Sequence, residues 1–556
     1  MGKNKVVIIG IDSGSFDVIL PMIERGELPN IASIMKSGAW GDLQSTVPSV
    51  TLPAWASFLS GVNPGKLGIF YLTRDSHSTY DEGPPTDISR VPVKFLWHHL
   101  SDNGKKVISV IPFPFPPTKI NGIIVSNTGS GVGLKALKSY PSEISNELVS
   151  ALPLEEVGKS QRNSKQEYGR GSTIREEYLD NVIKHADMTT EITRDISLYL
   201  LGKYEWDCFI TVFKSTDDIQ HRFWSFMDPS HPLYNNRGQD LYGDVIFDTY
   251  RKIDRAVGDI LSYAKDATVV MLSDHGMAPI RKFFYANRWL NENGLLKIKG
   301  ERRKADFRII KISLRDILNK LNIRINIFPN LNIPIVRRKS LPFSEEIDWS
   351  RTKAYATTFG ININMEGRER HGIVKSDEYN GICETLRDDL YQLTDPQTGE
   401  RVFEKVYRRE EIYTGPCLHD APDIVYHFKK PFYHAKKDLF SSFVFEEISK
   451  KEVVTANHLN HASTGIFLAK GPDIKTNERL DRIHIIDIAP TILYLMGLPI
   501  PMNMDGRLLW EVLHKEAETK RPPRYIDSED LQESMEGLSP EEEDIVKEQL
   551  RQLGYI

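Results

Sequence analysis

The stretch that decides the fold reads TVVMLSDHG and covers residues 268–276. Its first part is a run of apolar and β-branched residues, which is typical of a buried strand. The run ends in Asp274 and His275, which offer an oxygen and a nitrogen ligand that divalent metal ions accept. Because a strand is a rigid support, the stretch indicates a pair of metal ligands held at a strand end.

Three other segments repeat this design of a buried strand with Asp or His near one end. The strand-like runs cover residues 6–11, 208–213 and 464–469. Asp12 follows the first run. Asp217 and His221 follow the second at an i, i+4 spacing, which places both side chains on one face of a helix. His461 shortly precedes the third run. Since parallel α/β sheets gather their sites at the carboxyl ends of strands, the four segments predict one shared site.

Residues 1–284 alternate strand-like and helix-like segments. Residues 107–111 and 122–126 read as two further strands, and apolar residues recur at helical spacing over 244–265. A shorter helix is expected from Ala54 to about Leu59. This alternation predicts an α/β fold whose central, largely parallel sheet has helices on both faces.

We divide the chain into four parts: a first part of the catalytic core at 1–284, an inserted cap at 285–455, a second part of the core at 456–515, and an acidic tail at 516–556. The insertion is basic from Lys297 to Lys304, rich in Asn, Ile and Pro over 322–335, and reads as a strand pair or one long strand over 354–364. We expect this cap to shape substrate specificity without supplying metal ligands. In the tail, a narrow apolar stripe over 545–553 predicts a helix that docks on the body or on a second subunit. This helix is therefore compatible with a homo-oligomer.

The composition excludes several classes of function. The chain has 556 residues and a net charge of −5, with no basic stripe for nucleic acid and no long polybasic run for an anionic membrane surface. No apolar stretch reaches the length of about 18 residues that a transmembrane helix needs. The first strand begins almost at once, and no signal sequence is recognisable. Cys208, Cys383 and Cys417 are far apart and form no metal-type spacing, which favours a reducing cytoplasm.

A candidate nucleophile stands just before the helix expected from Ala54. Thr51 lies in the segment PSVTLPAW, residues 48–55. A hydroxyl at such a position either caps the helix or serves as a nucleophile, since the helix dipole and a metal ion would stabilise its alkoxide.

Five motifs in this order resemble the alkaline phosphatase superfamily, and within it the branch of type I phosphodiesterases and nucleotide pyrophosphatases. They are Asp12, Thr51-Leu52-Pro53, Asp217 to His221, Asp274-His275-Gly276 and His461. The resemblance covers about 1–284 and 456–510 and implies an alkaline phosphatase-like fold. It implies one divalent ion held by Asp12, Asp274, His275 and the Thr51 oxygen, and a second ion held by Asp217, His221 and His461.

The resemblance also implies a reaction. Two divalent ions about 3.5–4 Å apart clamp the entering and leaving oxygens of an in-line displacement. Thr51, activated by one ion, attacks phosphorus and forms a phospho-threonine, which water then hydrolyses. Oxygen and imidazole ligands without a thiolate suit Zn, which we favour, or Mn. The expected substrate is a small-molecule phosphate ester, in particular a phosphodiester, and a nucleotide-like ester belongs to this class.

Some positions depart from the family pattern. Ala54 stands where an Asn commonly binds a non-bridging phosphate oxygen, and Lys214 or the backbone N–H of Thr51 is the candidate replacement. Leu67 replaces a His that is not a metal ligand in the family. Asp218 adjoins Asp217 and is the alternative ligand, but the spacing to His221 favours Asp217.

Other readings compete with the diesterase. A sulfatase is disfavoured because Thr51 cannot be converted to formylglycine and Trp55 stands where an Arg would follow. A phosphoglycerate mutase uses Ser as its nucleophile. A phosphomonoesterase or phosphotransferase on the same fold stays open, whereas an inactive metal-binding protein is disfavoured because all matched positions are filled. Four aromatic residues either pack in the core or offer a stacking surface to the substrate: Phe70, Tyr71, Phe223 and Trp224.

Overall fold

The structure, a computed structural model, describes most of the chain. The described residues are 5–75, 80, 82–112, 115–127, 137–152, 176–299, 307–313, 332–338, 343–357, 359–430, 432–439, 441, 443–448, 459–527 and 547. The C-terminal docking helix predicted from residues 545–553 lies almost wholly outside them.

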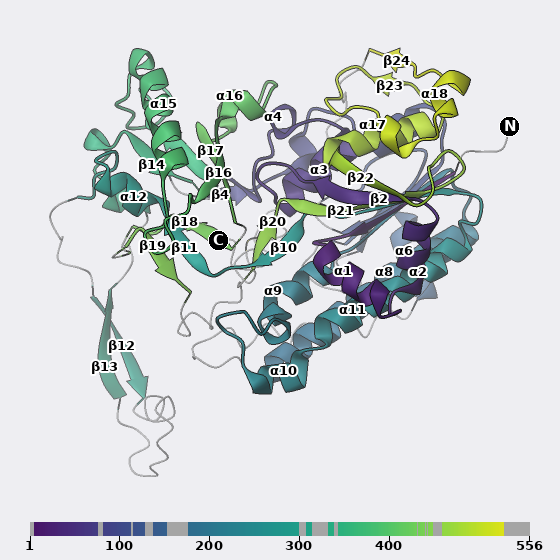
Figure 1. Ribbon diagram of the computed structural model, residues 1–556, viewed down its shortest axis with the longest axis horizontal. Coiled ribbons are helices and arrows are strands. Elements are labelled where there is room, and N and C mark those ends of the chain that lie inside the picture. The colour runs from purple at the N-terminus through teal and green to yellow at the C-terminus, as the bar shows by residue number, and fades with distance from the viewer. Residues whose placement is uncertain are drawn as a thin grey trace, which may run out of the picture.

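A sheet of nine strands forms the centre of the larger lobe in Figure 1. In spatial order its strands are β22 (Glu478–His484), β2 (Ala39–Gln44), β21 (Thr464–Lys470), β9 (Thr268–Leu272), β1 (Val6–Ile11), β8 (Cys208–Phe213), β5 (Val107–Pro112), β6 (Gly122–Asn127) and β7 (Leu137–Tyr140). The strands β9, β1, β8, β5 and β6 run parallel to one another, as do β2 and β22. Only β21 and β7 run antiparallel to their neighbours.

Helices cover both faces of this sheet because its strands are apolar on both sides. On β1, Val6 and Ile8 belong to one buried cluster, whereas Val7, Ile9 and Ile11 belong to the other. The first face packs against α3 (Thr51–Ser60), α4 (Pro64–Leu67), α5 (Leu96–Asp102) and α17 (Ile488–Leu495). The second packs against α1 (Phe16–Glu24), α2 (Pro29–Lys36), α6 (Glu143–Ala151), α8 (Glu176–Lys203), α9 (Ser215–Met227), α10 (Asn236–Tyr242) and α11 (Val245–Ser262). The predicted α/β fold with a largely parallel, doubly covered sheet is confirmed.

The inserted region forms a second lobe beside the sheet (Figure 1). Its main sheet has the order β14 (Ala354–Ala356), β15 (Gly360–Ile363), β17 (Ile424–Phe428) and β16 (Phe403–Arg408), and α15 (Ser376–Gln392) covers it. A second sheet consists of β18 (Tyr433–Lys436), β11 (Lys282–Tyr285) and β19 (Phe445–Glu447). The hairpin of β12 (Phe307–Ser313) and β13 (Asn332–Arg338) projects away from this lobe. Shorter helices of this lobe are α12 (Ala286–Glu292), α14 (Phe343–Glu346) and α16 (Arg409–Ile412).

Small elements join the two lobes or close the core. The pair β10 (Gly276–Pro279) and β20 (Leu459–Ala462) leads from the central sheet into the cap and back. The remaining elements are β3 (Thr73–Asp75), β4 (Glu82–Pro85), β23 (Ile500–Pro501), β24 (Tyr525–Ile526), α18 (Glu516–Lys520) and five 3-10 turns at Ile88–Arg90, Trp349–Arg351, Leu418–Asp420, Ile485–Asp487 and Trp510–Val512. The hydroxyl of Tyr413 in the cap donates a hydrogen bond to the backbone oxygen of Val47, just before the Thr51 segment.

Several local predictions need correction. The helix expected from Ala54 begins three residues earlier, at Thr51. The strand predicted over residues 107–111 extends one residue further, to Pro112. Of the two alternatives for residues 354–364, the strand pair is observed, since β14 pairs with β15 in antiparallel orientation. The four-part division of the chain stays a prediction. Its boundary at residue 284 falls within the strand β11.

Candidate functional site

The predicted site residues meet at the carboxyl edge of the parallel strands. Ile11 pairs with Phe213, so Asp12 and the start of α9 leave the sheet side by side. Asp274 and His275 follow the neighbouring strand β9. Because β21 runs antiparallel to β9, its first residues lie beside the last residues of β9, and Ser273 N–H donates to the oxygen of Ile466. A histidine that precedes β21 therefore reaches the same edge.

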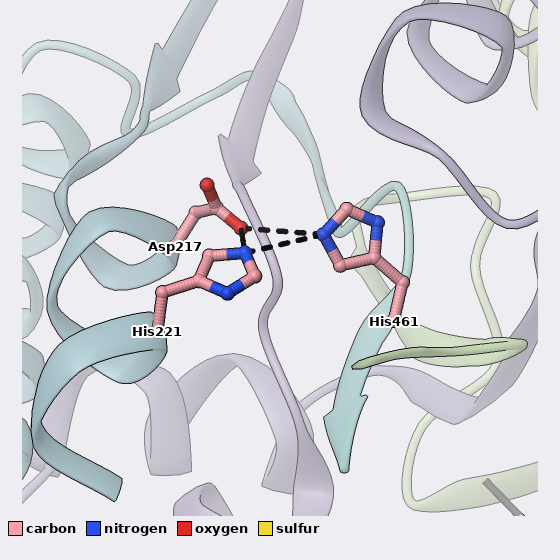
Figure 2. A group of neighbouring side chains, drawn as sticks. All are labelled: Asp217, His221 and His461. Carbon is pink, nitrogen blue, oxygen red and sulfur yellow. Dashed lines mark hydrogen bonds and ion pairs between the residues drawn. The ribbon is translucent and has the colours of Figure 1, made fainter. Parts of the chain in front are cut away.

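Asp217, His221 and His461 form a buried cluster. Figure 2 shows Asp217 and His221 one turn apart on α9, with the ring of His461 facing them from the opposite side. Asp217 Oδ1 lies 3.3 Å from His221 Nε2 and 3.9 Å from His461 Nε2. The two Nε2 atoms lie 3.3 Å apart. The three ligand atoms thus lie close together, and Asp217 and His221 share one face of α9, as their spacing predicted.

A hydrogen bond to the backbone fixes the position of the ring proton of His461. His461 Nδ1 lies 3.1 Å from the backbone oxygen of Ser49, which can only accept a hydrogen bond. Nδ1 therefore carries the proton, and Nε2 presents a lone pair toward His221 and Asp217.

A second cluster surrounds the hydroxyl of Thr51. Thr51 is the first residue of α3, and its Oγ1 lies 3.1 Å from His275 Nε2. The same nitrogen lies 3.1 Å from Asp274 Oδ2. The hydroxyl of Thr51 therefore contacts His275, one of the predicted metal ligands. The residue preceding the helix, Val50, supplies no side-chain cap.

Asp12 completes this cluster. Single ligand atoms of Asp12, Asp217 and His275 all lie within 4.8 Å of one another. Asp12 Oδ1 is buried and has no hydrogen-bond partner among the residues that the structure describes, and buried Asp274 Oδ2 accepts no hydrogen bond there beyond its ion-pair contact with His275 Nε2. Buried carboxylate oxygens without partners are rare because their desolvation is unfavourable. The donor set therefore fits divalent cations, which would neutralise these oxygens.

The pKa values of the buried carboxyl groups also indicate a functional site. Burial, together with the nearby carboxylates of Asp274 and Asp217, raises the pKa of Asp12 well above its ordinary value. Burial likewise raises the pKa of Asp274. Burial would also raise the pKa of Asp217, but His221, Lys214 and His461 hold it well below its ordinary value. Several acidic groups thus share one dry site, an arrangement typical of functional sites.

Position 276, directly after the Asp-His pair, has no room for a side chain. A Cβ atom at this position would lie 2.3 Å from the backbone oxygen of Thr464. The close approach lets β10 leave the sheet directly beside β21, so that His275 and His461 stack with ring centroids 3.7 Å apart.

Lys214 lies at the rim of the site, at the junction of β8 and α9. Its side chain is 29% exposed, and Nζ lies 3.7 Å from Asp218 Oδ1, its one ion pair among the described residues. Burial would lower the pKa of Lys214, but the carboxylates of Asp218, Asp217 and Asp12 raise it above its ordinary value. Asp218 thus lies against the ammonium group rather than in either cluster.

The other positions noted in the sequence are buried. Ala54 and Leu67 are buried in the apolar cluster beneath α3. The four aromatic candidates are also buried: Phe70, Tyr71, Phe223 and Trp224. Their packing, such as the edge contact of Phe70 with Tyr413, is that of core residues.

Sequence reasoning missed Ser13. Its hydroxyl lies 2.7 Å from Asp217 Oδ1 and 3.2 Å from His275 Nδ1, and its N–H donates to Asp274 Oδ1 at 3.0 Å. The one available signal was its position directly after Asp12. Ser49 was also missed, and its backbone oxygen accepts from His461.

Two further observations concern the whole chain. Cys208, Cys383 and Cys417 are all free thiols. Within the described residues, no helix combines the length and the apolar character that crossing a membrane requires.

Solved structures resemble this one at low sequence identity. A phosphonoacetate hydrolase from Sinorhizobium meliloti in complex with phosphonoformate is 15% identical, with a TM-score of 0.49, and the alignment covers 89% of this chain and 95% of that one. The murine ectonucleotide pyrophosphatase/phosphodiesterase 5 is 14% identical, with a TM-score of 0.46 and coverage of 92% and 100%. The human enzyme of the same name has a TM-score of 0.44 at 14% identity, with the same coverage.

The sequence itself matches a described family. No curated protein sequence matches the chain. The family described as type I phosphodiesterase / nucleotide pyrophosphatase matches residues 6–439, a stretch that holds every predicted site residue except His461. This match confirms the resemblance indicated by the five motifs, and the chain belongs to the type I phosphodiesterase / nucleotide pyrophosphatase family of phosphoric ester hydrolases.

Proposed function

We propose that this protein hydrolyses phosphodiesters through a covalent phospho-threonine at Thr51. The observation that carries the proposal is the position of the Thr51 hydroxyl, 3.1 Å from His275 Nε2, at the first residue of a helix and beside two clusters of acidic and imidazole side chains. A nucleophile, a set of cation ligands and a favourable helix dipole therefore meet at one point.

The residues divide into three roles. Asp12, Asp274, His275 and the Thr51 oxygen would hold one divalent cation, and Asp217, His221 and His461 would hold the other. When bound, the two cations, Zn²⁺ or Mn²⁺, supply the positive charge that favours the Thr51 alkoxide and stabilises the leaving oxygen. The ligand atoms are oxygens and imidazole nitrogens, which suit Zn²⁺ first and Mn²⁺ second.

The reaction proceeds in two displacements. The Thr51 oxygen attacks phosphorus, its bond to phosphorus forms, and the bond to the first ester oxygen breaks, so that an alcohol leaves with a proton. A water molecule then attacks the same phosphorus and releases a phosphate monoester, and the Thr51 hydroxyl recovers its proton. The N-terminal end of α3 stabilises the oxyanion of Thr51 in both steps.

Matched ester substrates test the reaction. Protein stripped with a chelator is assayed with bis-p-nitrophenyl phosphate and with p-nitrophenyl phosphate, before and after addition of Zn²⁺ or Mn²⁺. We expect metal-dependent turnover with preference for the diester. Absence of metal-dependent turnover of either ester would contradict the two-metal mechanism, whereas preference for the monoester would contradict the diesterase assignment alone.

The covalent step has its own test. Thr51→Ala should lose at least about 10³-fold in kcat because no group remains to form the intermediate. Thr51→Ser keeps the hydroxyl and should retain measurable turnover. Acid quenching during turnover, followed by mass spectrometry, should find phosphate on residue 51 in the wild type. Full activity of Thr51→Ala would exclude the covalent mechanism.

Lys214 supports a second candidate, a phosphomonoesterase or phosphotransferase. Its ammonium lies near Asp12 and Asp217 and has one long ion pair, to Asp218. We propose that Lys214 binds a non-bridging phosphate oxygen in place of the Asn that Ala54 replaces. An additional cation favours a dianionic phosphoryl group, which a monoester carries and a diester does not.

The substrate, the cellular location, the oligomeric state and the role of the cap are further parts of the proposal. A nucleotide-like ester is the substrate that the family description suggests. The free thiols support the cytoplasmic location expected from the sequence. We also propose that the protein forms a homo-oligomer and that the cap shapes substrate specificity.

A further inference from the structure

Ser13 has an unusual backbone conformation for a serine. Its φ is 60°, in the left-handed region, and its side chain is completely buried. A residue with a Cβ atom is strained in this region, whereas glycine adopts it freely. Strain of this kind persists where the surrounding structure requires it, and it clusters at functional sites.

The hydroxyl and the N–H of Ser13 contact residues of the two clusters. The hydroxyl lies 2.7 Å from Asp217 Oδ1 and 3.2 Å from His275 Nδ1. The N–H donates to Asp274 Oδ1 at 3.0 Å, and the carbonyl oxygen accepts from Gln220 Nε2 at 3.0 Å. Ser13 therefore joins β1 to α9 and to the segment after β9, which are the supports of both ligand sets.

The directions of these hydrogen bonds follow from the available protons. The hydroxyl has one proton, and the Asp217 carboxylate can only accept it. The hydroxyl oxygen then accepts from His275 Nδ1, which also lies 3.1 Å from the oxygen of Gly276. Both contacts place the proton of His275 on Nδ1, so that Nε2 presents its lone pair to Thr51 and Asp274.

We infer that Ser13 is a positioning residue that couples the two metal half-sites: its hydroxyl holds Asp217, a ligand of one cation, and His275, a ligand of the other, in a single hydrogen-bonded chain. The inference rests on the proposed two-cation function. It adds a residue that is not in either proposed ligand set but contacts a ligand of each.

The coupling has a physical consequence for cation binding. Asp217 and His275 must each be oriented when a cation binds, and the shared hydroxyl orients both at once. Partners of this kind typically change metal affinity by about 10- to 100-fold when they are removed. We therefore expect loss of the hydroxyl to weaken both binding steps rather than one.

Two substitutions separate the hydroxyl from the backbone strain. Ser13→Ala removes the hydroxyl and keeps a Cβ atom in the left-handed region, whereas Ser13→Gly removes the hydroxyl and the strain together. Full-length chelated protein is titrated with Zn²⁺ by calorimetry, and the unfolding temperature of the metal-free protein is measured in parallel. We expect both variants to bind Zn²⁺ about 10- to 100-fold more weakly at both sites, while Ser13→Gly unfolds at a higher temperature than Ser13→Ala.

Controls match each change elsewhere in the chain. Asn477→Gly relieves a similar φ of 52° at an exposed turn, and Ser109→Ala removes a fully buried hydroxyl on β5. Both should bind Zn²⁺ like the wild type. Wild-type affinity in both Ser13 variants would overturn the inference and leave the proposed function intact. A wild-type protein that binds no Zn²⁺ or Mn²⁺ would instead overturn the proposed function and the inference with it.

Discussion

Gly10 packs the strand that precedes Asp12 against the helix that begins at Thr51. A Cβ atom at this position would lie 2.5 Å from Cη2 of Trp55 and 2.8 Å from Cγ2 of Val212. Trp55 belongs to α3 and is buried against the sheet. The close packing of one glycine and one indole therefore sets the distance between a proposed metal ligand and the proposed nucleophile.

We predict that Gly10→Ala lowers both stability and activity. The added methyl group must displace Trp55, which should reduce the free energy of unfolding by about 1–3 kcal/mol. The displacement shifts α3, and kcat should fall by about 10- to 100-fold because the nucleophile is misplaced. Urea unfolding and diester turnover measure the two effects. Gly381→Ala is the matched control, since a Cβ there meets no atom within 4 Å on an exposed position of α15 and should stabilise that helix.

Lys214 provides a prediction about substrate charge. Lys214→Met should reduce kcat/KM for a phosphate monoester by about 10- to 100-fold, because a charge-assisted hydrogen bond is lost. The reduction should be smaller for a diester, which carries one negative charge fewer. Parallel assays with the two p-nitrophenyl esters measure the ratio. Lys203→Met, which removes a lysine that pairs with Glu147, should leave the ratio unchanged. An equal loss for both esters would show that Lys214 does not discriminate by charge.

At this scale, the sequence predicted which side chains converge but not what orients them. Asp274, His275 and Asp12 stood out because each follows an apolar run. Ser13 could not be recognised in the same way, since its contacts with Asp217 and His275 span 204 and 262 positions of the chain. A hydroxyl next to a ligand has no pattern of its own, and its role depends on the register of three separate elements.

Strands were the elements that could be predicted best. The runs that became β1 and β8 begin and end at the predicted residues because both faces of each strand are buried. The direction of β21 was not predictable, because an apolar run carries no information about which neighbour it pairs with. The start of α3 at Thr51 was also missed, because Pro53 falls in its first turn, where proline is tolerated.

The strand β11 is fastened to the cap by a buried ion pair. Lys282 Nζ lies 2.6 Å from Asp395 Oδ2, and the hydroxyl of Tyr433 donates to the same oxygen at 2.6 Å. Burial alone would raise the pKa of Asp395, but the hydrogen bonds from Lys282 and Tyr433 lower it to about 2. The folded state thus favours the ionised carboxyl.

We predict that Asp395→Asn destabilises the protein by about 3 kcal/mol at neutral pH, because it leaves the Lys282 charge buried without its partner. The folded pKa lies below the ordinary value of 3.8, so the contribution is fully present above that value and is lost as the pH falls toward 2. Urea unfolding from pH 7 downward should show the difference between wild type and variant narrowing below about pH 4.

An exposed pair provides the comparison for this prediction. Glu292→Gln breaks the ion pair with Arg288 on α12, where both side chains are partly exposed. Exposed pairs contribute about 0–1 kcal/mol, so little change is expected. A comparable loss of unfolding free energy in both variants would mean that burial of the Lys282–Asp395 pair does not increase its contribution to stability.

For the whole molecule, cation binding should govern thermal stability. The metal-free protein holds Asp12, Asp217 and Asp274 together in a buried site. A ligand that binds only the folded state stabilises it by about 2.7 kcal/mol at a concentration 100 times its Kd. We predict that Zn²⁺ raises the unfolding temperature of the chelated wild type and that a chelator reverses the rise.

Asp12→Asn is the informative variant for this prediction. Removing one of several crowded carboxylates should raise the unfolding temperature of the metal-free protein, because repulsion is relieved, and should largely abolish the further rise with Zn²⁺. A metal-free Asp12→Asn protein that is less stable than the metal-free wild type would contradict this account of the charges. Differential scanning calorimetry measures the unfolding temperatures of the wild type and of Asp12→Asn, each with and without Zn²⁺.

The place of β21 between β2 and β9 has a consequence for how the chain folds. Both neighbours are complete by residue 272, yet the strand that joins them begins at Thr464. During synthesis, the first half of the chain therefore emerges with a gap in its sheet, and β9 has an unpaired edge until nearly two hundred further residues have been made. Such non-local pairing slows folding and leaves an edge open to other chains. We expect a fragment of residues 1–284 to aggregate, and a chaperone that protects exposed strand edges to improve the yield of the whole chain.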